Sequence, residues 1–190
     1  MSHRTSGLYR FLEVPALYEA LQRLLGADAA RKRFVARFLR PASGMRILDI
    51  GCGPGPMLDY LPADVAYTGY DLNAAYIEAA RQRYGARARF LHARVGEEPA
   101  EIEASSFDLV IAKGILHHLN DDEAHQLLRA AFRYLRPGGF FVSLDGVRHE
   151  GQKMLSRWII SLDRGRAVRD PEGYENLARA HTPMVEGALI

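Results

Sequence analysis

At 190 residues the chain is long enough for one domain with a buried core, and 48% hydrophobic with 25% charged residues is ordinary for a globular protein. The formal net charge of +2 is nearly balanced, no apolar run is long enough to span a membrane, and the N-terminal residues lack the pattern of a secretory signal. The single cysteine, Cys52, excludes an internal disulfide and fits a reducing compartment, so a cytoplasmic location is expected.

The first elements predicted are two helices, 15–25 and 28–39, because apolar residues recur in both at helical intervals. Gly26 is suited to end the first helix and Pro41 to end the second. The two helices predict an N-terminal helical cap over residues 1–44.

Two arginine-rich stretches, 31–40 and 81–89, could contact phosphates. Both place their charges at helical spacing beside apolar residues, which is typical of a solvated helix face. A nucleic-acid partner is therefore not favoured, since no base-reading motif accompanies them.

From Met45 onward, short apolar strands alternate with helices, and the clearest helix runs from Asn120 to a stop at Pro137–Gly139. This alternation predicts an α/β fold with a doubly wound, mostly parallel, Rossmann-like sheet and helices on both faces. We expect this core over residues 45–150, followed by helices and at most one short strand over 151–190. The predicted strands are 45–50, 65–70, 88–92, 107–112 and 139–145.

Three closely spaced glycines, Gly51, Gly53 and Gly55, directly follow the first predicted strand in the stretch "RILDIGCGPGP". In open α/β sheets, ligands bind beyond the carboxyl ends of the strands, and glycine lets the backbone turn tightly and approach a ligand. A plain strand-to-helix turn would need only one glycine. The spacing therefore predicts a cofactor-binding loop.

The loop differs from the dinucleotide-binding pattern, because its third glycine comes one residue early and Pro56 takes the final glycine position. A short helix behind two prolines is also poorly suited to hold a pyrophosphate. These features favour a ligand without phosphates over a nicotinamide cofactor, which remains as an alternative.

Asp71 ends the second predicted strand, twenty residues after Gly51, which is the spacing of an acid that accepts hydrogen bonds from ribose hydroxyls. One carboxylate can accept from both hydroxyls. The alternative is that Asp71 caps the following helix, but Asn73 could do that itself.

The segments "LDIGCGPG", "YTGYDLN", "FDLVIAKGILHHLND" and "YLRPGGFFVSLDG" occur in the order found in class I S-adenosylmethionine-dependent methyltransferases, which residues 45–147 resemble. The resemblance implies S-adenosylmethionine as the cofactor and S-adenosylhomocysteine as its product. Residues 14–26 resemble the helical cover of such enzymes, and 162–180 resemble a segment that follows the fifth strand in small-substrate methyltransferases. The cofactor-binding residues that the resemblance implies are Asp49, Gly51, Cys52, Gly53 and Gly55 in the loop, Asp71 at the ribose and Leu72 against the adenine.

The chain departs from the family pattern at two places. Where many relatives have an acid after the third strand, this chain has Arg94 and Val95, so we expect the adenine to be recognised through backbone groups there. After Leu177, too few residues follow for the two further strands that relatives usually carry. We expect either a truncated chain or a sheet edge completed in another way.

The resemblance implies methyl transfer to an O, N or C atom of a small molecule, which requires mainly alignment of acceptor and methyl group. His117 and His118 are candidate general bases, because the ordinary pKa of histidine is about 6.5. The alternative is that one packs under its loop and the other caps a helix. We further expect the Lys113 backbone at the methionine portion and Tyr18 over the sulfonium, and no metal.

A second hypothesis is a cofactor-binding protein without turnover that acts through a partner. The shortened C-terminus motivates it, because an uncovered fifth strand could pair with another chain and form a homodimer. The third hypothesis is the nicotinamide oxidoreductase considered above.

Overall fold

The computed structural model describes residues 27–97, 99–148 and 167–189, and the chain divides into two units, 1–41 and 42–190. In the first unit, α3 (Ala27–Phe34) continues into the π-helical turn η1 (Val35–Leu39). Arg40 ends this helix in the left-handed conformation, with φ of 43°. The predicted helix 15–25, with Tyr18, lies outside the described residues.

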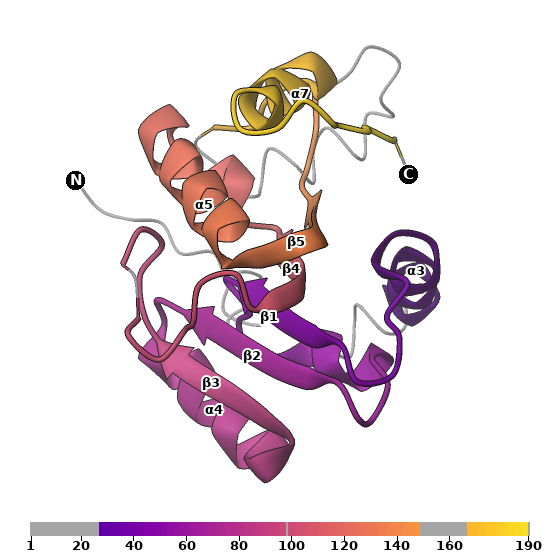
Figure 1. The fold of residues 1–190 in the computed structure, drawn as a ribbon, viewed down its shortest axis with the longest axis vertical. Coiled ribbons are helices and arrows are strands. Elements are labelled where there is room, and N and C mark those ends of the chain that lie inside the picture. The colour runs from indigo at the N-terminus through magenta and orange to yellow at the C-terminus, as the bar shows by residue number, and fades with distance from the viewer. Residues whose placement is uncertain (1–26, 98, 149–166, 190) are drawn as a thin grey trace, which may run out of the picture. The chain divides into compact units, whose positions relative to one another are not determined.

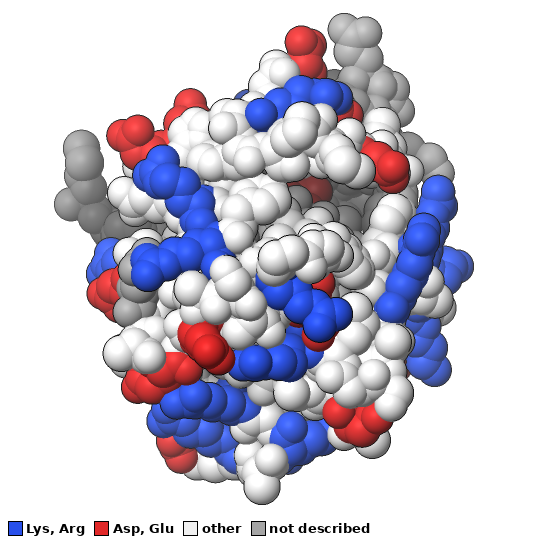
Figure 2. All heavy atoms as spheres, in the orientation of Figure 1, with Lys and Arg blue, Asp and Glu red and all other residues white. Residues whose placement is uncertain are grey.

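The basic side chains of this first helix face solvent, as its spacing predicted. Lys32, Arg33 and Arg37 are all exposed. Figure 2 shows lysine and arginine side chains running along α3. The arginine-rich stretch 31–40 therefore forms a solvated helix face.

The second unit is built on a parallel sheet of five strands in the order β3-β2-β1-β4-β5 (Figure 1). Strand β1 lies in the centre, paired with β2 on one side and β4 on the other. This order confirms the predicted doubly wound, Rossmann-like sheet. The strands are β1 (Arg46–Ile50), β2 (Ala66–Asp71), β3 (Ala88–His92), β4 (Phe107–Lys113) and β5 (Leu135–Leu144).

Helices α4 (Ala74–Tyr84) and α5 (Asp121–Tyr134) pack on opposite faces of the sheet. Because side chains alternate along a strand, Ile47 and Leu48 of β1 point to different faces. Leu48 belongs to the core cluster that includes the apolar side of α5. On the face of Ile47, the Phe90 ring lies 5.9 Å from the Tyr84 ring of α4, measured between centroids.

Helix starts follow the capping signals in the sequence. Asn73 precedes α4, and its side chain accepts hydrogen bonds from the N–H groups of Ala75 and Tyr76. Asn120 and Glu123 form a reciprocal capping box at the start of α5. Between β1 and β2, the connection contains only the 3₁₀ turn η2 (Pro56–Tyr60), the short helix expected there.

The arginines of the stretch 81–89 donate hydrogen bonds within the fold. Arg81 donates to the Phe90 carbonyl, and Arg87 donates to the carbonyls of Leu58 and Leu61. Arg83 pairs with Asp59, and Arg89 donates to the Glu101 carbonyl. These contacts give all four arginines a structural role.

The structure corrects the predicted end of α5. The helix ends at Tyr134 and β5 begins at Leu135, so the Pro137–Gly139 turn lies inside the strand instead of ending the helix. The register shifts there, because Phe107 pairs with Leu135 but Leu109 pairs with Phe140. A Cβ on Gly139 would lie 2.9–3.0 Å from three backbone carbonyl oxygens. The turn therefore forms a bulge that glycine alone accommodates.

The last helix is α7 (Pro171–Arg179), capped by Asp170, whose carboxylate accepts from the Gly173 N–H at 2.7 Å. Leu177 of α7 is buried in the same core cluster as α5. Figure 1 shows α7 beside α5. No strand follows α7 within residues 167–189, so the short strand allowed for after Leu177 is absent from this part of the chain.

Candidate active site

The glycine loop begins where β1 ends and is tied to β2. The N–H groups of Gly51 and Cys52 both donate to the Tyr70 carbonyl, at 2.8 and 3.1 Å. All three loop glycines have positive φ, 72° at Gly51, 56° at Gly53 and 75° at Gly55. Other residues rarely adopt this conformation, so the loop depends on glycine for its backbone path.

The three glycines differ in what surrounds them. A Cβ on Gly51 would lie 2.6 Å from Ile115 Cδ1, and one on Gly55 would lie 2.9 Å from Phe90 Cε1. A Cβ on Gly53 would meet no atom within 4 Å. Gly51 and Gly55 therefore allow close packing inside the protein, whereas Gly53 presents bare backbone to open space.

Asp71 lies beside this open backbone. Its Oδ2 accepts a hydrogen bond from the Gly53 N–H at 2.9 Å, and its Oδ1 accepts from the Asn73 N–H at 2.7 Å. The Asn73 side chain caps α4, so the helix does not need Asp71 for that purpose. Each carboxylate oxygen can accept a further hydrogen bond, which makes Asp71 suited to a diol.

Leu72 follows Asp71 at the end of β2 and leaves 56% of its surface exposed. The Arg94 side chain is also exposed, while its N–H donates to Glu97 Oε2 at 2.9 Å. Val95 packs against the core cluster. Leu72 thus offers an exposed apolar surface after β2, and recognition of the adenine through backbone groups at Arg94 and Val95 stays a prediction.

Asp49 in β1 and Cys52 in the loop are both buried. The Tyr67 hydroxyl donates to Asp49 Oδ2 at 2.6 Å. Burial raises the pKa of Asp49 from 3.8 to about 6, although the Tyr67 hydrogen bond and the positive charge of Lys113 oppose the rise. Burial likewise raises the pKa of the Cys52 thiol, which keeps it protonated and makes it unsuited to be a nucleophile.

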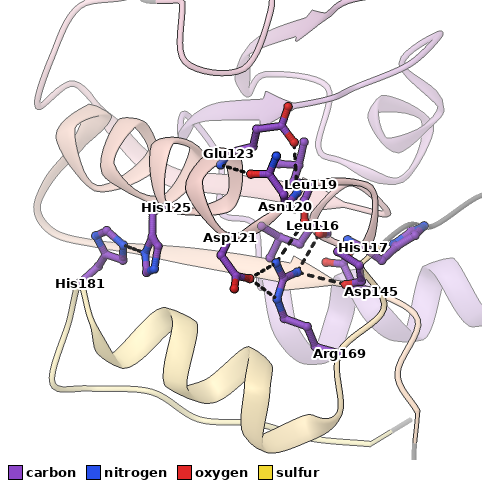
Figure 3. A network of polar contacts seen from close by, with 11 residues as sticks. Leu116, His117, Leu119, Asn120, Asp121, Glu123, His125, Asp145, Arg169 and His181 are labelled. Carbon is purple, nitrogen blue, oxygen red and sulfur yellow. Dashed lines mark hydrogen bonds and ion pairs between the residues drawn. The ribbon is translucent and has the colours of Figure 1, made fainter.

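His117 lies in the 3₁₀ turn η4 (Leu116–His118) that follows β4, and only 5% of its surface is exposed. Its Nδ1 lies 2.8 Å from Asp145 Oδ1, and the same oxygen accepts from the His117 main-chain N–H at 3.2 Å (Figure 3). His118 is exposed, with its ring centroid 4.1 Å from that of His117. The two predicted histidines therefore differ in burial, and His117 is held by the Asp145 carboxylate.

The turn carrying His117 adjoins the glycine loop. Ile115 is the residue against which Gly51 packs. A Cβ on Gly114 would lie 3.9 Å from His117 Cε1, and Lys113, just before it, ends β4. These contacts bring Asp71, the glycine loop and His117 to the carboxyl end of the sheet, where open α/β folds bind their ligands.

The sequence pattern did not identify Asp145 or Arg169 as part of this site. Asp145 directly follows β5, and its position at a strand end was the one available signal. Arg169 donates to the Leu116 and Leu119 carbonyls that flank His117. Both contacts join segments far apart in the sequence, which spacing does not reveal.

The fold agrees with the comparisons to known proteins. Residues 47–139 match a family described as a methyltransferase domain. The chain is 31% identical over 133 residues to malonyl-[acyl-carrier protein] O-methyltransferase from a Paenibacillus species, a match covering 66% of this chain and 48% of that one. It is 39% identical over 112 residues to 27-O-demethylrifamycin SV methyltransferase from Amycolatopsis mediterranei, covering 55% of this chain and 40% of the relative.

Among solved structures, phosphoethanolamine N-methyltransferase 2 from Haemonchus contortus, with S-adenosylhomocysteine bound, superposes with a TM-score of 0.64 at 24% identity. The superposition covers 80% of this chain and 36% of that one, and it shows a shared fold. This chain thus spans about half or less of the length of these relatives.

The parallel sheet has the fold of the methyltransferase of known structure on which it superposes, and the glycine loop lies at the carboxyl end of its central strand. The family match identifies residues 47–139 as a methyltransferase domain, which confirms the resemblance to class I S-adenosylmethionine-dependent methyltransferases seen in four sequence segments. In the part of the chain that the structure describes, no helix is long and apolar enough to cross a membrane. Within those same residues, no three His, Cys, Asp or Glu side chains are grouped as a metal site.

Proposed function

We propose that the protein transfers the methyl group of S-adenosylmethionine to a hydroxyl oxygen of a small molecule, and that His117 accepts the hydroxyl proton. The observation that carries the donor side is the open backbone at Gly53 beside the Asp71 carboxylate. The observation that carries the acceptor side is the buried His117–Asp145 pair. Both lie at the carboxyl end of the same sheet.

The residues present fit this cofactor. A nucleoside needs an acceptor for its ribose hydroxyls, an apolar surface for its base and a loop that lets it approach the backbone. Asp71, the exposed Leu72 and Gly53 supply these three requirements side by side. When bound, S-adenosylmethionine supplies a methyl group activated by a positively charged sulfur and becomes S-adenosylhomocysteine.

On the acceptor side, Asp145 determines which His117 nitrogen can take a proton. Asp145 Oδ1 already accepts from the His117 main-chain N–H, and a carboxylate can only accept. Nδ1 therefore carries the ring proton in the neutral imidazole and donates it to Asp145, which leaves Nε2 as the basic nitrogen. When the acceptor hydroxyl is methylated, Nε2 would take the proton that its oxygen loses.

This arrangement favours an oxygen acceptor. A hydroxyl must lose its proton during transfer, so a positioned base contributes about 10²- to 10⁴-fold to the rate. The names of the two relatives described above both refer to oxygen: one is an O-methyltransferase, and the other is a methyltransferase of a 27-O-demethyl compound. We therefore place hydroxyl compounds ahead of amines and carbon acceptors.

The test begins with the cofactor. S-adenosylmethionine at micromolar concentration should raise the melting temperature of the wild-type protein, and Asp71→Ala should abolish this rise. Asp64→Ala is the matched control, because it removes the same charge from an exposed position that contacts Ser43, before the first strand. A wild-type melting curve unchanged by S-adenosylmethionine would contradict the proposal.

The acceptor is then sought by measuring S-adenosylhomocysteine formed with a panel of phenols, alcohols, carboxylic acids and amines. We expect product with hydroxyl compounds and not with amines. Turnover confined to amines would overturn the oxygen assignment while leaving the donor site intact.

A further inference from the structure

Arg169 joins the segment before α7 to the turn that carries His117. Only 12% of its side chain is exposed, and its guanidinium lies between that turn and the start of α5 (Figure 3). Nη1 donates to the Leu116 carbonyl at 3.0 Å, and Nη2 donates to the Leu119 carbonyl at 3.1 Å. The guanidinium thus bridges the two ends of the turn around His117.

The same guanidinium also holds the start of α5. Nη2 and Nε donate to Asp121 Oδ1, at 2.6 and 3.2 Å. These hydrogen bonds lower the pKa of Asp121 and keep its carboxylate charged. All three guanidinium nitrogens are therefore engaged, in a geometry that the single ammonium group of lysine cannot reproduce.

Main-chain hydrogen bonds place His117 between this segment and Asp145. The Ala167 N–H donates to the His117 carbonyl at 3.0 Å. The His117 N–H in turn donates to Asp145 Oδ1. The Arg148 N–H donates to the Arg169 carbonyl at 3.1 Å, which connects the segment to the chain that follows Asp145. Both sides of the His117–Asp145 pair are therefore attached to residues 167–169.

Helix α7 supports Arg169 from the other side. The Arg169 guanidinium carbon lies 5.7 Å from the centre of the Tyr174 ring, a distance at which a cation is attracted to an aromatic face. The Tyr174 hydroxyl donates to the Gly146 carbonyl, next to Asp145. Arg169 therefore contacts α7 through Tyr174 and the η4 turn through its hydrogen bonds.

We propose that Arg169 is a positioning residue for methyl transfer: by bridging the carbonyls of Leu116 and Leu119, it keeps the His117 ring in the orientation in which Nδ1 donates to Asp145. The inference rests on the proposed role of His117 as a base. Arg169 itself acts through the turn and not on the donor or the acceptor. Its loss leaves the cofactor loop and Asp71 intact.

The experiment follows the His117 ring directly and needs no acceptor. In protein labelled with ¹⁵N-histidine at pH 8, long-range ¹H–¹⁵N correlations distinguish the two neutral tautomers, and His117→Gln assigns the signal. We expect His117 of the wild-type protein to show one tautomer, with the proton on Nδ1. Arg169→Met should give a mixture of tautomers, because the turn no longer fixes the ring against Asp145.

Two further variants make the result interpretable. Arg179→Met is the matched control, since Arg179 makes one exposed contact with Glu175 on α7, and it should leave the His117 signal unchanged. Should Arg169→Met fail to fold, Arg169→Lys keeps the charge without the bridging geometry and should also give mixed tautomers. A single Nδ1-protonated His117 in a folded Arg169 variant would overturn the proposal.

Turnover provides the second readout once a hydroxyl acceptor is known. Arg169→Lys should lower kcat about 10- to 100-fold, the effect of a misplaced catalytic group, with the Kd of S-adenosylmethionine unchanged. An unchanged kcat would also overturn the positioning role. Failure of the proposed function is distinguishable, because it appears as absent cofactor binding or as full activity of His117→Gln, whereas the tautomer measurement depends on neither.

Discussion

The Gly53 N–H donates to Asp71 Oδ2 at 2.9 Å and joins the loop after β1 to the last residue of β2, eighteen positions further on. The Asp71 carboxylate therefore holds the glycine loop in place, and it also lies beside the open space at Gly53. Removing Asp71 should loosen the loop as well as remove the ribose acceptor. This coupling explains why we expect a complete loss of the cofactor-induced stabilisation from that single change.

Adding one methyl group at Gly53 should weaken cofactor binding. Gly53→Ala places its Cβ in the open space beside Asp71, and the positive φ adds strain of about 1–2 kcal/mol. Gly44→Ala is the matched control, because Gly44 also has a positive φ, of 74°, and no atom within 4 Å of its Cβ position, but precedes the first strand. Calorimetry should show about tenfold weaker binding of S-adenosylmethionine for Gly53→Ala, equivalent to 1.4 kcal/mol, and unchanged binding for Gly44→Ala. Equal affinities for the two variants would place the cofactor elsewhere.

Changing the buried histidine should slow methyl transfer without affecting donor binding. His117→Gln removes the proton acceptor, and we expect the rate with a hydroxyl compound to fall by about 10²- to 10⁴-fold. Asp145→Asn should lower it comparably, because the amide no longer stabilises the Nδ1-protonated ring. The rate of S-adenosylhomocysteine formation at saturating donor measures both effects. His118→Gln, at the exposed neighbour, should have a much smaller effect, and the reverse ranking would assign the base to His118.

The buried carboxyl of Asp49 should make the protein less stable as the pH rises from 4 to 7. Its pKa is about 6 in the fold against 3.8 ordinarily, so the folded state binds the proton more tightly than the unfolded state does. The resulting stabilisation is complete below pH 3.8 and is lost as the pH rises through 6, by about 2 to 3 kcal/mol in total.

Asp49→Asn removes this titration and can still accept the Tyr67 hydrogen bond. Denaturant unfolding from pH 4 to 7 should therefore show the wild-type free energy of unfolding falling relative to that of Asp49→Asn. Asp64→Asn, at an exposed carboxylate, serves as the charge control. Parallel curves for Asp49→Asn and the wild type would contradict the prediction.

The contact between α5 and the residues after α7 should weaken in acid. His125 Nδ1 lies 2.8 Å from His181 Nε2, an arrangement in which one ring donates and the other must be neutral to accept. Burial, followed by the charges of His125 and Arg129, lowers the pKa of His181. The stabilisation that neutral His181 provides is therefore complete above pH 6.5, and it is lost as the pH falls through the lowered pKa of His181.

His181→Phe keeps a ring that can stack on Phe132, whose centroid lies 6.3 Å from that of His181, and removes the titration. The melting temperature of the wild type should fall more between pH 8 and pH 5.5 than that of His181→Phe. An identical fall in both proteins would show that this histidine pair does not contribute to the pH dependence.

Local signals in the sequence predicted most of the fold. The strands, the Asn73 and Asn120 caps and the glycine loop each follow from residues that are neighbours in the chain. The end of α5 was placed three residues too late, because Pro137 and Gly138 look like a helix stop but form a bulge within β5. A bulge depends on its partner strand, and a helix stop does not.

The site was predicted less completely. The glycine loop and Asp71 follow family segments, and the structure brings them together. Asp145 lies 28 positions from His117, and Arg169 lies 53 positions from Leu116. Such contacts arise from tertiary packing, so neither spacing nor residue type could single out these two partners.

The main-chain hydrogen bond between Arg148 and Arg169 has a consequence for how such an enzyme can diversify. This hydrogen bond holds the two residues that border positions 149–168 side by side, and doubling the length of a chain segment between two fixed ends costs only about 0.6 kcal/mol in closure entropy. Insertions or deletions between these two arginines would leave the donor-binding end of the sheet unchanged. Changes in chain length at these positions should therefore cost the fold little stability.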